Sequence, residues 1–125
     1  MKNRTLRKSF ANAWTGLSES LQKERNLRLH FLFLMIVFVC AAWLQLDLVR
    51  WALLFVASGL VVITELINTA IEHLVDMVTK ERCEEARRVK DMAAGAVLVS
   101  AFFAVFIGIA VFLDPALTML TEMIH

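Results

Sequence analysis

The sequence predicts an all-α membrane protein in which three membrane-spanning helices follow an N-terminal amphipathic helix on the membrane surface. Hydrophobic residues make up 59% of the 125-residue chain, more than the roughly half that ordinary globular domains contain. The excess gathers in three apolar blocks, each able to supply the roughly 20 residues with which a helix crosses a bilayer. Three such blocks cannot close a β-barrel, so we expect helices. The length fits one domain over residues 1–125.

The three predicted membrane spans are residues 29–46, 51–78 and 92–113. Trp43 and Trp51 flank the short link between the first two spans, as tryptophans at membrane interfaces commonly do. The first span begins only after a long charged segment and lacks a cleavage pattern of small residues, so we do not expect a signal peptide.

Residues 1–28 are predicted to form the surface helix. Apolar side chains recur there at spacings of three and four, which places them on one face of a helix. The opposite face is polar and basic, and a helix of this kind suits the inner membrane surface. A helix packed against a soluble partner domain is the alternative. The apolar positions are Leu6, Phe10, Trp14, Leu17 and Leu21.

The distribution of Lys and Arg predicts the orientation of the chain. Seven of these residues lie within residues 1–28, and five lie in the link between the second and third spans. The first link holds only Arg50, and the segment after residue 113 holds none. Because cytoplasmic loops carry an excess of positive charge, the N-terminus and the second link are expected in the cytoplasm.

Several common functional motifs are absent from the sequence. Cys40 and Cys83 show no CxxC spacing, so neither a disulfide framework nor a thiolate metal site is expected. Glycine occurs only at positions 16, 59, 95 and 108. This excludes a Walker P-loop and the Gly-rich loop of protein kinases. Any nucleotide site must be of another kind.

A polar stripe at the end of the second span is the strongest functional signal. At about 100° per residue, its five members fall within about 60° of Glu65 on one helix face. Acids within a membrane cost on the order of 2.5–3.5 kcal/mol at its centre and less towards its edge, so they are functional candidates by default. An interhelical hydrogen-bond network that holds an oligomer together is the alternative. The stripe consists of Glu65, Asn68, Thr69, Glu72 and Asp76.

Counting residues along the span separates the three acids by depth. A helix rises about 1.5 Å per residue, so a span that starts near Trp51 leaves a core of about 30 Å near Ala70. Glu65 is therefore expected within the inner leaflet, Glu72 at the cytoplasmic boundary and Asp76 in water. The stripe is predicted to lead from lipid to cytosol.

Four further charged residues are predicted to lie near the same boundary: Glu24 and Arg28 before the first span, and Lys90 and Asp91 before the third. Clustered carboxylates repel one another unless a cation or a proton neutralises one of them. Mg²⁺ takes oxygen ligands and commonly binds one or two carboxylates together with substrate phosphates, and a lysine can supply a point charge to a phosphate. Together with an acid in the membrane, these groups favour phosphoryl transfer to a lipid alcohol.

Four motifs resemble a known family, the small bacterial integral-membrane diacylglycerol kinases and their undecaprenol kinase relatives. The motifs are "AWTGL" (13–17), "ERNLRLH" (24–30), "ELINTAIEHLVD" (65–76) and "KDMAAGAVL" (90–98). The resemblance extends to about Leu113. It implies a homotrimer with active sites shared between subunits, a multi-pass position in the bacterial inner membrane, and the use of ATP with Mg²⁺ as cofactor.

The resemblance also implies a role for each matching residue. Glu65 would be the general base on the lipid hydroxyl, and Glu24 and Glu72 would bind both Mg²⁺ and the nucleotide. Lys90 and Asp91 would lie at the nucleotide phosphates. Asn68 and Asp76 are implied to support the site. The lipid substrate would contact Arg28, Trp14 and Ala94 in addition to Glu65. Because phosphoryl transfer depends mostly on positioning and charge neutralisation, so short a set can be sufficient.

The lipid substrate is predicted to be undecaprenol, with diacylglycerol as the alternative. The diacylglycerol-selective branch tends to have an acid in place of His30 and Gly-Ser in place of Ala93-Ala94. His30 is interpreted as a contact to lipid or nucleotide, or as a histidine at the interface. His73 is interpreted as structural, facing away from the centre of the stripe. Cys83 stands where many relatives have a histidine.

Two other classes of function are weighed against a kinase. A small proton-coupled transporter could use Glu65, but it has no need of the acids and the lysine at the cytosolic edge. A non-catalytic oligomeric membrane scaffold would use the stripe only for helix association.

Overall fold

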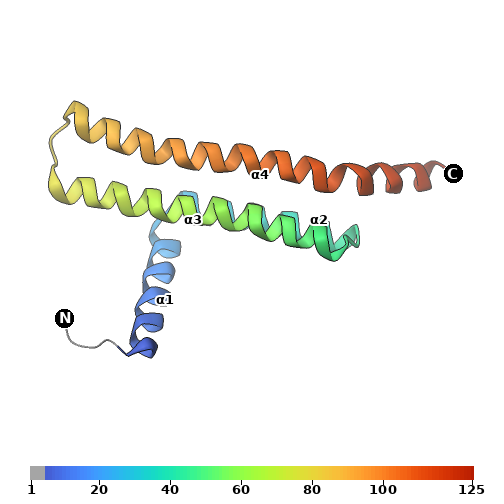
Figure 1. The fold of residues 1–125 in the computed structure, drawn as a ribbon, viewed down its shortest axis with the longest axis horizontal. Coiled ribbons are helices and arrows are strands. Elements are labelled where there is room, and N and C mark those ends of the chain that lie inside the picture. Colours follow the sequence, from blue (N-terminus) through green and yellow to red (C-terminus); the bar gives the residue numbers. More distant parts are fainter. Residues whose placement is uncertain (1–4) are drawn as a thin grey trace.

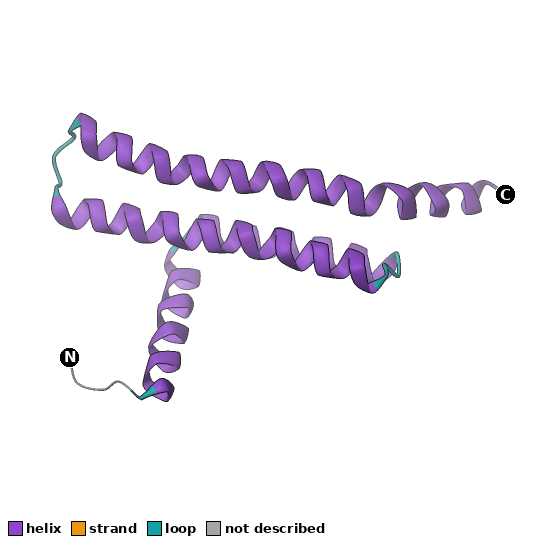
Figure 2. Cartoon of the chain, in the orientation of Figure 1, coloured by secondary structure: helices purple, strands orange, loops and turns teal. Residues whose placement is uncertain are grey.

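The computed structural model describes residues 5–125, which form four helices (Figures 1 and 2). The part of the predicted surface helix at residues 1–4 lies outside the described residues. Residues 5–125 contain no strand, which confirms the all-α fold class. The helices are α1 (Leu6–Lys23), α2 (Arg25–Trp43), α3 (Leu48–Val78) and α4 (Glu84–Ile124).

Three of these helices are long and apolar enough to cross a membrane, namely α2, α3 and α4. The long helices α3 and α4 lie side by side and run in opposite directions, and α2 packs on α3 (Figure 1). Helix α1 projects away from this bundle, as expected for a helix that lies on the membrane surface. The three membrane-spanning helices and the separate amphipathic helix agree with the sequence-based prediction.

The chain turns sharply between α1 and α2 at Glu24. Its backbone is extended (φ −97°, ψ 112°), so α1 ends at Lys23 and α2 begins at Arg25. The surface helix is therefore shorter than residues 1–28, and α2 begins before the predicted span. The Arg28 guanidinium donates hydrogen bonds to the carbonyl oxygens of Leu21 (3.2 Å) and Gln22 (2.6 Å). It thereby satisfies carbonyls that the end of α1 leaves without helical partners.

A tight turn joins α2 to α3 at the other end of the bundle. Gln45 takes a positive φ of 51°, and the amide of Leu46 donates to the carbonyl of Ala41 at 3.2 Å. This is the Schellman arrangement that often ends a helix, with glutamine at the position that usually holds glycine. Helix α3 begins directly afterwards, because Asp47 accepts a hydrogen bond from the Arg50 amide at 3.0 Å.

The best-packed apolar cluster lies beside this turn and joins α2, α3 and α4. Phe38 stacks near Trp51 and Phe55, with ring centroids 5.8 and 5.0 Å away. Elsewhere most large apolar side chains are exposed, for example Phe102 on α4, as expected for surfaces that face lipid or other subunits. The buried members of the cluster are Ala41, Leu46, Leu54 and Val111.

Helix α4 extends beyond the predicted span of 92–113 at both ends. Its 41 residues correspond to roughly 60 Å at about 1.5 Å per residue, twice the thickness of a bilayer core. The helix continues through Pro115 to Ile124, beyond the last residue of the predicted span. At least one of its ends must therefore lie outside the hydrocarbon region.

The hydrogen bonds at the N-cap of α3 should make the protein less stable as the pH falls into the acidic range. Hydrogen bonds from the Arg50 amide and then its guanidinium hold the pKa of Asp47 below its ordinary value of 3.8. A lowered folded-state pKa stabilises the fold above the unfolded-state pKa, and this stabilisation is lost as pH falls through the folded-state value. Asp47→Ala should lower the midpoint of thermal unfolding at neutral pH, measured by circular dichroism in detergent, and should flatten its decline below about pH 4.

Asp114 provides the matched control, since it lies 3.9 Å from Arg50 but is highly exposed and caps no helix. Asp114→Ala should shift the midpoint less than Asp47→Ala. Equal shifts would mean that the N-cap hydrogen bond does not cause the pH dependence.

Candidate active site

The polar stripe on α3 becomes progressively more exposed towards the α3–α4 loop. Glu65, Asn68 and Thr69 are buried, Glu72 is half-buried, and Asp76 is exposed. This order follows from the position of each residue along α3. Helix α4 runs alongside α3 up to the loop (Figure 1). Helix α2 begins at Arg25, beside the contact between Glu24 and His73, so it flanks only the earlier part of the stripe. The single chain therefore presents one acid inside the bundle and another in solvent.

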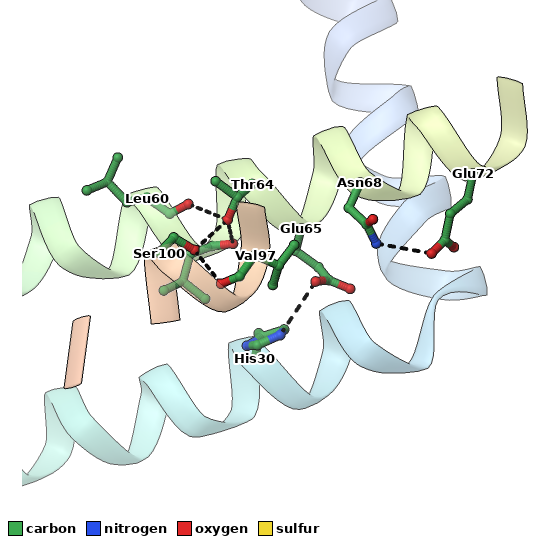
Figure 3. Close-up of polar contacts among 9 residues, drawn as sticks. His30, Leu60, Thr64, Glu65, Asn68, Glu72, Val97 and Ser100 are labelled. Carbon is green, nitrogen blue, oxygen red and sulfur yellow. Dashed lines mark hydrogen bonds and ion pairs between the residues drawn. The ribbon is translucent and has the colours of Figure 1, made fainter. Parts of the chain in front are cut away.

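Glu65 is the most deeply buried acid of the stripe, with 5% of its surface exposed. Its Oε2 lies 3.7 Å from Nε2 of His30 on α2, and the two side chains point toward each other in Figure 3. The pair is charged on both sides only while His30 is protonated. Because an isolated buried carboxylate is costly, this imidazole is the natural partner of Glu65.

Asn68 and Glu72 are joined one helical turn further along α3 (Figure 3). The Asn68 side-chain amide donates to Glu72 Oε1 at 3.2 Å, which orients the carboxylate. Asn68 Oδ1 is buried and has no hydrogen-bond partner among residues 5–125. An unsatisfied buried acceptor costs about 1–3 kcal/mol, so this oxygen is available to a ligand that the chain alone does not supply.

Glu24 contacts α3 through His73. Glu24 Oε1 lies 3.2 Å from His73 Nε2, within hydrogen-bond distance. Sequence reasoning missed this contact, because it placed His73 away from the centre of the stripe. No helical period could reveal it, since the partners are 49 positions apart and meet only because the chain turns at Glu24.

Lys90 and Asp91 lie at the start of α4, close to the α3–α4 loop. Lys90 Nζ is 2.5 Å from Asp76 Oδ1, so the lysine is directly beside the exposed end of the stripe. Asp91 instead pairs with Arg87 at 2.6 Å. The hydrogen bond to Glu84, followed by the charge of Asp91, raises the pKa of Arg87, which therefore remains a cation.

A solvent-open cavity of about 480 Å³ lies at the same end of the bundle. Asp76 and Lys90 form part of its wall, and Lys80, Arg82 and Arg87 add positive charge. Asp76, Glu81 and Glu84 also line the cavity, so its wall carries four cationic and three acidic side chains. The cationic side chains are of the kind that binds phosphates.

Comparison with known proteins identifies the family. The prokaryotic diacylglycerol kinase family matches residues 11–112. The chain is also 39% identical to an undecaprenol kinase from Bacillus subtilis (strain 168) over 106 residues, covering 85% of this chain and 86% of the relative. The chain belongs to the prokaryotic diacylglycerol kinase family.

Two diacylglycerol kinases show comparable similarity. One from Synechocystis sp. is 39% identical over 113 residues, which cover 90% of this chain but only 65% of the relative. Another from Escherichia coli (strain K12) is 35% identical over 98 residues, covering 78% of this chain and 80% of the relative. The relatives therefore agree on lipid phosphorylation and differ in the lipid, and this chain is a lipid kinase rather than a transporter or a scaffold.

Three oxygen-bearing side chains near the stripe are of the kind that binds a magnesium ion shared with substrate. Residues 5–125 contain no group of three or more His, Cys, Asp or Glu side chains arranged to hold a metal by themselves. Mg²⁺, however, usually binds through one or two carboxylates together with water and substrate phosphates. Glu24, Glu72 and the free Asn68 Oδ1 are of this type.

The structure does not bring every predicted site residue to the stripe. Trp14 is exposed on α1, and Ala94 is exposed on α4. Arg28 is bonded to the end of α1. Within residues 5–125, no hydrogen bond or ion pair joins Trp14 or Arg28 to Glu65, and their roles toward the lipid stay predictions.

The contact between Lys90 and Asp76 should contribute little to stability. Both side chains are substantially exposed, and exposed ion pairs contribute about 0–1 kcal/mol. Asp76→Asn should therefore lower the free energy of unfolding in detergent by no more than about 1 kcal/mol. The difference from wild type should shrink at high salt, because screening weakens exposed pairs. A loss of several kcal/mol would instead indicate that the pair is buried in the assembled protein.

Proposed function

We propose that this kinase transfers the γ-phosphoryl group of ATP to undecaprenol at the cytoplasmic face of the bacterial inner membrane. Diacylglycerol is the alternative acceptor. The observation that carries the proposal is the buried carboxylate of Glu65 on a membrane-spanning helix, one turn from the Asn68–Glu72 pair. A base at that depth can reach the hydroxyl of a lipid, while the phosphate-binding groups remain nearer to water.

The reaction needs one proton acceptor and one set of phosphate-binding groups. As the lipid hydroxyl oxygen bonds to the γ-phosphorus, the bond to the oxygen that bridges the β and γ phosphates breaks, and ADP leaves. The Glu65 carboxylate takes the hydroxyl proton, which is general base catalysis. Developing charge on the phosphoryl group requires positioned cations more than covalent chemistry.

The remaining site residues are assigned to the nucleotide. Glu24 and Glu72 would hold Mg²⁺, which when bound neutralises phosphate charge. Lys90 and Asp91 would lie at the nucleotide phosphates, and Lys90 lines the cavity beside the exposed end of the stripe. Asn68 supports the site by orienting Glu72. Asp76 does so by holding Lys90 close to the stripe.

Undecaprenol is favoured over diacylglycerol by particular residues. Overall identity does not separate the two, because the undecaprenol kinase of Bacillus subtilis and the diacylglycerol kinase of Synechocystis sp. are both 39% identical to this chain. His30 and Ala93-Ala94 resemble the undecaprenol branch, and His30 is the residue beside the proposed base. The lipid subsite would also include Trp14, Arg28 and Ala94.

We further propose a homotrimer with shared active sites, oriented with its N-terminus in the cytoplasm. The single chain leaves the apolar surface of α4 uncovered, and Asn68 Oδ1 lacks a partner within it. The excess of Lys and Arg in residues 1–28 and in the second link supports the orientation. Cross-linking in native membranes would test the trimer. We expect cross-linked products of two and three subunits and none that are larger.

A side-by-side kinase assay tests the proposed reaction. Purified full-length protein in detergent is incubated with labelled Mg-ATP and either undecaprenol or diacylglycerol, and labelled lipid phosphate is counted. We expect a higher kcat/KM with undecaprenol. Product from diacylglycerol alone would reverse the ranking of substrates, and no product from either would refute both.

Glu65→Gln should abolish turnover while the fold and the oligomer persist. The amide keeps the shape of the side chain but cannot accept the proton, so kcat should fall by at least about 10²-fold. Helix content, size in detergent and Mg-ATP affinity should match wild type. Substantial activity in this variant would reject Glu65 as the base.

Glu72→Ala should weaken nucleotide binding and leave the proposed general base intact. Loss of one proposed metal ligand should weaken Mg-ATP binding by about 10–100-fold, measured by calorimetry or by KM. Glu19→Ala is the matched control, since Glu19 is exposed on α1 and its ion-pair partner among the described residues is Lys23. Unchanged nucleotide affinity in Glu72→Ala would exclude its metal role.

A further inference from the structure

The proposed general base faces a problem after each turnover. Glu65 would hold the proton of the lipid hydroxyl, and it must lose that proton before it can act again. Its side chain is only 6% exposed, so water has little direct access. A proton acceptor that reaches both Glu65 and the exterior would solve this problem.

His30 has the position that such an acceptor requires. Its Nε2 is 3.7 Å from Glu65 Oε2, whereas 32% of its side chain is exposed. It lies in the second turn of α2 and points at Glu65 from the opposite helix (Figure 3). Histidine is also the side chain best suited to take up and release protons near neutral pH.

The other ionisable groups around this pair have partners of their own. From the α1–α2 junction, Glu24 contacts His73, and the Arg28 guanidinium is bonded to two carbonyls at the end of α1. On α3, Glu72 accepts a hydrogen bond from the Asn68 amide.

Helix α4 faces this region with Ser100, whose hydroxyl bonds to Thr64 and to the Val97 carbonyl (Figure 3). The charged groups of α4 that lie closest to the stripe are Lys90, paired with Asp76, and Asp91, paired with Arg87. Among the described residues, His30 is thus the titratable side chain that both contacts Glu65 and meets solvent.

We propose that His30 is the proton relay that returns Glu65 to its carboxylate form, an inference that rests on Glu65 being the base. The protonated Glu65 gives its proton to Nε2 of neutral His30, which leaves a carboxylate beside an imidazolium. The imidazolium then releases its Nδ1 proton to water, which leaves His30 as the Nε2–H tautomer. Proton exchange with water restores the Nδ1–H tautomer, so that Nε2 can accept a proton again. No electron is transferred, and only bonds to hydrogen form and break.

The observed separation is compatible with this role. At 3.7 Å the two atoms are beyond direct hydrogen-bond distance, so transfer needs a small side-chain rotation or one bridging water. Proton-transfer contacts are commonly long without substrate and shorten in the reacting complex. His30 acts through Glu65, and it is therefore a positioning residue.

Imidazole rescue tests the relay directly. In His30→Ala, kcat for the lipid alcohol should fall by about 10–100-fold, while KM for Mg-ATP stays within about twofold of wild type. Added imidazole should restore kcat, and the restoration should grow as pH rises, because the free base is the form that accepts a proton. A merely structural histidine would not produce a rescue that follows the free base.

Two variants make the result specific. His125→Ala removes an exposed histidine at the far end of α4 and should leave both kcat and the response to imidazole as in wild type. Glu65→Gln should stay inactive at every imidazole concentration. Activity in wild type and its absence in Glu65→Gln would support the proposed reaction. If, in addition, His30→Ala kept full kcat, or if its kcat did not respond to imidazole, the relay would be refuted while the proposed reaction would stand. If wild type phosphorylates neither lipid, the proposed reaction itself fails.

A second measurement keeps His30 in place and serves if His30→Ala does not fold. The chain has three histidines, so the ¹⁵N imidazole resonances can be assigned from single variants. Glu65→Gln should shift the resonances of His30 and leave those of His125 in place. An unchanged His30 signal would show that the two side chains do not interact, which overturns the relay.

Discussion

A carboxylate on a membrane-spanning helix is buried between helices, and the rest of this structure depends on that constraint. Glu65 lies where lipid would penalise it, so α2 and α4 must flank α3 at this level. His30 from α2 faces the acid, and the Thr64–Ser100 hydrogen bond, at 2.8 Å, joins α3 to α4 one residue earlier. The same cover that makes the acid tolerable also separates it from water, so a general base at this position would need a route for its proton.

A gradient of solvation along α3 organises the candidate site. The buried Glu65, the half-buried Glu72 and the exposed Asp76 occupy one helix face within three turns. Each position suits a different partner, from a lipid hydroxyl to a hydrated nucleotide. A single helix therefore fixes the spacing between these three side chains.

The sequence predicted the fold class, the family and lipid kinase activity, and all three predictions are confirmed. They rested on local properties of the chain, namely hydropathy, helical period and short motifs. The roles of Glu65, Glu24 and Glu72 stay predictions. What local patterns could not supply were contacts between distant residues. The Glu24–His73 contact depends on an extended backbone at a single position, and the length of α4 depends on helix propagation past the apolar block and through Pro115.

The break at Glu24 has a mechanical consequence. Helix α1 comprises 18 residues, so it is a rigid arm of about 27 Å whose inner end carries a candidate metal ligand. Its exposed apolar side chains, such as Phe10 and Trp14, would sit in the lipid headgroup layer. A tilt of this arm relative to the bundle would require rotation of the backbone at Glu24. Such a tilt would therefore move the carboxylate of a candidate metal ligand.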